Sequence, residues 1–220
     1  MDGVRVEARE RRAAQVLAGS SIAEATVSAG AAVLAIIALA GTLPVLLISI
    51  ATIGVGVSLL FVGAATSAKY ARMLQDISGG RIQTTDLTVG SSAETLGGIA
   101  GIVLGILSLI GWFQPATLIP IAAIVFGAAI MFGAGVNSRL NAFQLSVIEE
   151  RPHARRAAED AVAASSGLQV LAGIAAITLG ILALLGIESL NLSIIAILVV
   201  AVSDILSGSA LGTRMMSMFS

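Results

Sequence analysis

Three acidic side chains stand inside otherwise apolar stretches of the chain: Glu24, Glu94 and Asp204. A carboxyl group in such surroundings can relay a proton, bind a cation or accept structural hydrogen bonds. Asp204 lies deepest, roughly 10 Å from the nearer end of its stretch if that stretch is helical. We therefore take Asp204 as the candidate ion or proton site. It is expected either to face water or to bond a nearby hydroxyl, and Ser203, Ser207 and Thr178 are the candidate donors.

Glu24 and Glu94 also fit a structural role, because each follows a serine at the spacing of a helix-capping box. The spacing occurs three times, in the pairs Ser21 and Glu24, Ser91 and Glu94, and Ser166 and Gln169. Glutamine can cap a helix but cannot titrate, so the third pair favours capping over proton or cation binding. The titrating alternative stays open for the two glutamates.

Other chemistries lack the residues they need. The chain has no cysteine and one histidine, His153, so it offers no thiolate metal site, no iron–sulfur ligands and no imidazole cage. No phosphate-binding loop, zinc-protease motif or nucleophile elbow is found. A formal net charge of −1 gives no basic excess for binding nucleic acid. We expect a non-enzymatic protein without metal or cofactor.

The elements that position the three acids are long apolar runs. Hydrophobic residues make up 57% of the 220-residue chain and charged residues 11%, with a mean hydropathy of +1.00. A helix crossing a bilayer needs about 20 apolar residues. Six runs have this length, near residues 22–40, 43–65, 93–111, 117–136, 168–186 and 191–211. The sequence thus predicts an all-α polytopic membrane protein with six transmembrane helices and the lipid bilayer as its surroundings.

These runs repeat in pairs. AIIALAG at 35–41 returns as GILSLIG at 105–111 and GILALLG at 180–186. The second helices repeat in the same register, which predicts three parallel hairpins around a pseudo-threefold axis. We expect one membrane domain over 20–220, after a cytoplasmic amphipathic arm at 1–19. Its hairpins are predicted at 20–75, 90–145 and 165–220.

The basic residues are one-sided. All twelve precede the first run, follow the last, or lie in the two long connections, and the three short connections contain none. The positive-inside rule then predicts a multi-pass protein of the inner (plasma) membrane with both termini cytoplasmic. The mixed-charge segment 139–165 is the candidate surface for a cytoplasmic protein partner, and a homo-oligomer is the other partner considered.

Glycines are expected to set how the helices touch. Gly97, Gly101 and Gly105 form two overlapping GxxxG steps, which allow close backbone approach where lipid supplies no hydrophobic drive. A glycine-lined permeation path has the same pattern and is the alternative.

The segment GILSLIGWFQPATLIPIAAIVFGAAIMFGAG, at 105–135, resembles the membrane repeat of the HdeD-type acid-resistance family. The resemblance extends over the six runs and implies a six-helix inner-membrane protein linked to acid stress, with no catalytic residues to carry over. Three hypotheses follow: a structural or stress-protective membrane protein, a small proton-linked transporter or channel that uses Asp204, and a membrane anchor or scaffold for a soluble partner.

Overall fold

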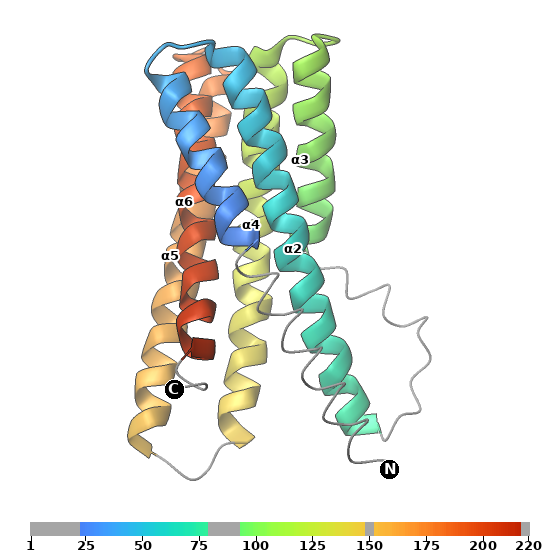
Figure 1. Ribbon diagram of the computed structural model, residues 1–220, viewed down its shortest axis with the longest axis vertical. Coiled ribbons are helices and arrows are strands. Elements are labelled where there is room, and N and C mark those ends of the chain that lie inside the picture. Colours follow the sequence, from blue (N-terminus) through green and yellow to red (C-terminus); the bar gives the residue numbers. More distant parts are fainter. Residues whose placement is uncertain (1–22, 79–92, 148–151, 217–220) are drawn as a thin grey trace.

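The computed structural model describes residues 23–78, 93–147 and 152–216, with side chains over 23–67, 93–134 and 166–207. All secondary structure in this part of the chain is helical (Figure 1). A first helix at Ala23–Leu39 precedes α2 (Pro44–Ser78), α3 (Ala93–Ile110), α4 (Pro115–Val147), α5 (Pro152–Leu184) and α6 (Ser189–Met216).

The predicted fold class is confirmed. Five helices are long and apolar enough to cross a membrane, through Pro44–Ser67, Ala93–Ile110, Pro115–Ala134, Ser166–Leu184 and Ser189–Ser207. Ala23–Leu39 is apolar but shorter. Large apolar side chains face outward on all of these helices, a surface that suits lipid rather than water. The chain is therefore an all-α polytopic membrane protein.

The three short connections share one backbone geometry. Gly41, Gly111 and Gly186 each have a positive φ, of 87°, 74° and 84°. Each glycine N–H donates to the carbonyl three residues back, and the next N–H donates to the carbonyl five residues back. This is the Schellman C-cap, in which glycine accepts a left-handed backbone at no steric cost. The three turns lie together at one end of the bundle (Figure 1).

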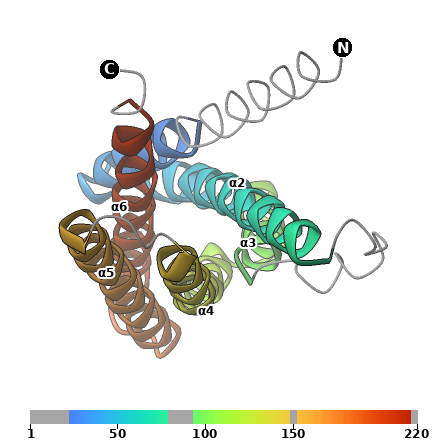
Figure 2. The same cartoon turned by 90° about the horizontal axis from the view of Figure 1, so that it is seen from below.

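The second helix of each hairpin is an inner helix. α2, α4 and α6 all contact one another, and Figure 2 shows α3 and α5 on the outside of this group. Val55 of α2, Phe126 of α4 and Val200 of α6 are each fully buried. Apolar side chains therefore fill the middle of the bundle at this level.

Neighbouring hairpins meet at glycine pairs. A Cβ atom added at Gly56 of α2 would lie 2.8 Å from the Gly98 carbonyl oxygen of α3. The corresponding distance from Gly127 of α4 to the Gly173 oxygen of α5 is 2.5 Å. Both helix pairs thus cross backbone against backbone, the geometry that small residues allow in lipid.

The predicted GxxxG steps of α3 do not form one interface. Gly97 and Gly101 face α4, where a Cβ at Gly101 would overlap the Phe126 ring. Gly105 instead faces Ile53 of α2. All three glycines are buried between helices of the same chain, and they give α3 two close-packed sides.

Pro120 lies inside α4 and so leaves the carbonyl of Ala116 without its helical N–H donor. The Ser189 hydroxyl, at the start of α6, donates to this oxygen at 3.1 Å. A side chain from the third hairpin thus satisfies the carbonyl that the proline frees, and the bond ties the two hairpins together near their turns.

Helices extend beyond the predicted spans at the other end of the bundle. α4 runs to Val147 and α5 begins at Pro152, so most of 139–165 is helical rather than a loop. Alanine, arginine and glutamate are good helix formers, and nothing requires a helix to stop where the hydrocarbon ends.

This extension makes the third predicted capping box wrong. Ser166 and Gln169 lie well inside α5, whose amides there are bonded along the helix, so the pair caps no helix start. The predicted arm at 1–19, Ser21 and Ser91 lie outside the described residues.

Candidate functional site

Asp204 is the acid that enters the bundle from α6. It lies about midway along α6, and only 3% of its side chain is exposed. The Ser58 hydroxyl of α2 donates to its Oδ2 atom at 3.1 Å. The carboxyl group is therefore held inside the protein by a hydrogen bond from another helix rather than by contact with lipid.

A second hydroxyl extends this contact to a third helix. The Oγ atoms of Ser28 and Ser58 lie 2.7 Å apart, and both side chains are fully buried. Ser28, Ser58 and Asp204 thus form a polar chain from the helix Ala23–Leu39 through α2 to α6. A hydroxyl both donates and accepts, so such a chain can pass a proton as well as hold the helices together.

The donors predicted for Asp204 were wrong. The Ser207 hydroxyl donates to the backbone carbonyl of Asp204, not to its carboxyl group, and the Thr178 hydroxyl donates to the carbonyl of Ile174 in its own helix. The Ser203 hydroxyl, although buried, has no hydrogen-bond partner.

Glu24 and Glu94 bring two more carboxyl groups to this region. Both side chains are buried. The Thr66 hydroxyl of α2, which also donates to the Val62 carbonyl of its own helix at 2.9 Å, lies 3.5 Å from Glu94 Oε2. On its other side the Glu94 carboxyl group occupies the space that a side chain at Gly133 of α4 would take. Glu94 is therefore directed into the bundle, between α2 and α4.

The ionisable groups among the described side chains are these three acids and Glu188, which is exposed near a turn. No group of three metal-binding side chains is found in the described part of the chain. Buried carboxyl groups with hydroxyls beside them can exchange protons or hold a monovalent cation. They lack the clustered donors that a divalent metal requires.

The space at Gly133 gives a direct test of where Glu94 lies. We expect Gly133→Ala to destabilise the bundle by about 1–3 kcal/mol, because the new methyl group would overlap the carboxyl group. Thermal unfolding in detergent measures the effect, and Gly167→Ala, at an open position, is the matched control. In combination with Glu94→Ala most of the loss should disappear. If Gly133→Ala lowered stability equally with and without Glu94, the Glu94 side chain would not lie against Gly133.

Sequence reasoning missed the residues that surround the acids, namely Ser28, Ser58, Thr66 and Gly133. The available signal was weak. Hydroxyls in apolar helices often bond their own backbone, as Thr52 does to the carbonyl of Ile48. Only the three-dimensional packing shows that Ser28 and Ser58 bond across helices instead.

Comparison with protein families, with characterised proteins and with solved structures finds no match to this chain. What the bundle does therefore has to follow from its own residues.

Proposed function

We propose that this chain is a non-enzymatic membrane protein that binds protons at its buried carboxyl cluster and so makes the packing of its helices responsive to acid. The hydrogen-bonded chain from Ser28 through Ser58 to Asp204 carries the proposal, because it places a titratable group at the junction of three helices. A change of charge at Asp204 then acts on all three helices at once.

The direction of the response follows from charge. The Ser58 hydroxyl of α2 bonds Asp204 directly, and the other carboxyl groups buried among the described residues are those of Glu24 and, on α3, Glu94. Three carboxylates ionised together in a medium of low dielectric constant repel one another. Added protons remove this repulsion, so acidification strengthens the contacts between the helices.

The side chains packed between the inner helices favour binding of protons at Asp204 over passage of protons through the bundle. Asp204 lies about midway along α6, more than half-way from the short turn that precedes this helix to its last described residue. Between it and the short turns, the inner helices are packed by buried side chains such as Ile48, Ile119 and Ile197. A proton-linked transporter that uses Asp204 is the second candidate, supported by the burial of a carboxyl group within the span.

Further features agree with this proposal. The Schellman turns and the glycine crossings recur at corresponding positions, which supports an internal repeat of three parallel hairpins. We infer an inner-membrane location with both termini and the basic helix ends in the cytoplasm. The carboxyl cluster would then titrate with cytoplasmic pH, in keeping with the acid-stress role that the HdeD-type resemblance implies.

A scaffold role for 139–165 remains a separate proposal. Its support is the helical extension of α4 and α5 past their apolar spans, which carries this charged segment away from the hydrocarbon. Loss of a co-purifying protein on deletion of 143–160 would favour this role.

The main test is the pH dependence of stability in lipid nanodiscs. We expect the unfolding temperature of the wild-type protein to rise as the pH falls from neutral, by an amount equivalent to about 1–2 kcal/mol. Asp204→Asn should remove most of this rise, because asparagine keeps the shape and the hydrogen bond but cannot titrate. Glu188→Gln, which replaces an exposed acid outside the cluster, is the matched control and should leave the rise intact.

Proton flux in liposomes separates the two candidates. Wild-type protein without flux but with the pH-dependent rise supports proton binding as the function. A flux abolished by Asp204→Asn would favour the transporter. A stability that is the same at all pH values would contradict both uses of Asp204.

A further inference from the structure

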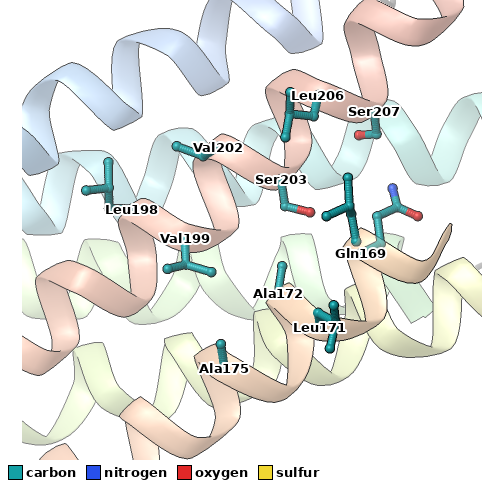
Figure 3. A pocket seen from close by; sticks show the side chains of 11 residues that line it. Gln169, Leu171, Ala172, Ala175, Leu198, Val199, Val202, Ser203, Leu206 and Ser207 are labelled. Atoms are coloured by element: carbon teal, nitrogen blue, oxygen red, sulfur yellow. The ribbon is translucent and has the colours of Figure 1, made fainter. Parts of the chain in front are cut away.

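An open groove lies between α5 and α6 on the outer surface of the third hairpin (Figure 3). Its volume is about 480 Å³, and its walls are almost entirely apolar. Leu171 and Leu206 on its rim are more than half exposed, so the groove opens sideways toward the hydrocarbon of the bilayer.

The groove has one polar end. Gln169 and Ser207 line the end of the groove that lies farther from the short turn between α5 and α6. Figure 3 shows Ser203 on the same side, with Val199 and Ala175 toward the other end. An amphiphile with its polar head at the Gln169 end and its apolar chain toward Val199 matches this distribution.

Ser203 supplies the observation that points to a ligand. Its side chain is 7% exposed and lines the groove, and its hydroxyl has no partner in the protein. A buried hydroxyl left without a hydrogen bond costs about 1–3 kcal/mol. By contrast, Ser49 and Ser108, which line a second recess at the turn end, bond each other at 2.8 Å.

The repeat explains why the groove lies in this hairpin. In the second hairpin, a Cβ atom added at Gly97 of α3 would lie only 2.5 Å from the Ala129 Cβ atom of α4. The two helices therefore pack closely at this glycine. By the repeat spacing the corresponding residues of the third hairpin are Ala172 and Ser203, and both line the groove. The third hairpin thus carries a methyl group and a hydroxyl at these two positions, and the hydroxyl lies in the groove.

We propose that this groove binds a membrane phospholipid, with an acyl chain along Ala175 and Val199 and the Ser203 hydroxyl donating to an ester carbonyl of the lipid. Ser203 carries the buried hydroxyl that has no partner among the described side chains, and the ester carbonyls of a phospholipid are hydrogen-bond acceptors attached directly to its acyl chains. A helix of a second copy would not offer such an acceptor, because its backbone carbonyls are already bonded along the helix.

Native mass spectrometry of the full chain, released from nanodiscs in mild detergent, tests the proposal. We expect the wild-type protein to retain one diacyl phospholipid. Ser203→Ala should reduce its retention about fivefold, the effect of losing one hydrogen bond. Ser193→Ala, on the same helix but bonded to the backbone of Ser189, is the matched hydroxyl control and should leave retention unchanged.

Two further arms identify the ligand. A phospholipid with ether-linked chains lacks the carbonyl, so the wild-type protein should retain it as weakly as Ser203→Ala retains the ester lipid. Val199→Trp should fill the groove and abolish retention, whereas Val103→Trp on the exposed face of α3 should not. Equal retention of ester and ether lipids, retention unaffected by Ser203→Ala, or replacement of the lipid by a second copy of the chain would overturn the proposal.

Discussion

Gly127→Ala should destabilise the bundle by about 2–3 kcal/mol, although alanine is the better helix former. The added methyl group would lie 2.5 Å from the Gly173 carbonyl oxygen and close to the side chains of Ala176 and Ile177. A backbone oxygen cannot rotate away as a side chain can. The strain therefore has to separate α4 from α5 along their whole contact, and lipid offers no hydrophobic drive to restore it.

Gly30→Ala is the control that isolates this effect. Gly30 is an exposed glycine within a helix, and nothing lies within 4 Å of a Cβ added there. We expect this variant to be neutral or more stable by up to about 1 kcal/mol, from helix propensity alone. Thermal unfolding of both variants in one detergent should thus show a loss of stability for Gly127→Ala and no loss for Gly30→Ala. Shifts of the same sign and size would mean that α4 and α5 do not cross backbone against backbone.

The same comparison distinguishes packing from permeation as the use of the glycines. Gly97, Gly101 and Gly105 face side chains of α4 and α2 at contact distance. Glycines that lined a path would face open space instead, as Gly30 does. The sequence alone could not separate these two uses. A GxxxG step shows that two residues are small, but it does not identify the groups that face them.

The spans and turns could be predicted because they depend on local sequence. A run of apolar residues determines where a helix meets hydrocarbon, and a glycine followed by a polar or proline-containing segment determines where a hairpin turns. The predicted span at 93–111 and the helix Ala93–Ile110 differ by one residue for this reason. Such features need no knowledge of the neighbouring helices.

The surroundings of the acids could not be predicted in the same way. Ser203 is next to Asp204 in sequence, yet it points into the groove between α5 and α6, while the bonded hydroxyl is that of Ser58, far away in the chain. Successive residues on a helix point about 100° apart, so sequence neighbours rarely share a partner. The helix that packs against a residue decides its hydrogen bonds, and the repeat pattern does not identify that helix.

Asp204→Leu should fold and be as stable at neutral pH as the wild-type protein, or more stable by about 1–2 kcal/mol, while losing the response to acid. The corresponding positions of the repeat are Leu59 in α2 and Ile130 in α4, and both are buried apolar side chains. Leucine fits the same kind of inner position and removes the cost of burying a carboxyl group. It leaves Ser58 with Ser28 as its partner, so no buried hydroxyl is isolated.

Leu59→Asp is the reciprocal variant and should lose about 3 kcal/mol or more. In the repeat, position 59 corresponds to Asp204, and the residue of the next hairpin that corresponds to Ser58 is Ala129 of α4. Alanine has no hydroxyl to donate to a carboxyl group at position 59. A carboxyl group placed there would be buried in a similar apolar layer without the hydrogen bond that Asp204 receives. The two substitutions therefore swap aspartate and leucine at corresponding positions, and their effects on the free energy of unfolding should have opposite signs.

Unfolding curves of both variants at neutral and acidic pH distinguish a structural role of Asp204 from proton binding. If Asp204 is present mainly to hold the helices together, Asp204→Leu should be among the more damaging substitutions, and its stability should fall at every pH. If Asp204 binds protons, the variant stays folded and its curves at the two pH values coincide. Asp204 stands where the other two hairpins carry the buried apolar residues Leu59 and Ile130, so these curves separate a structural carboxyl group from one that binds protons.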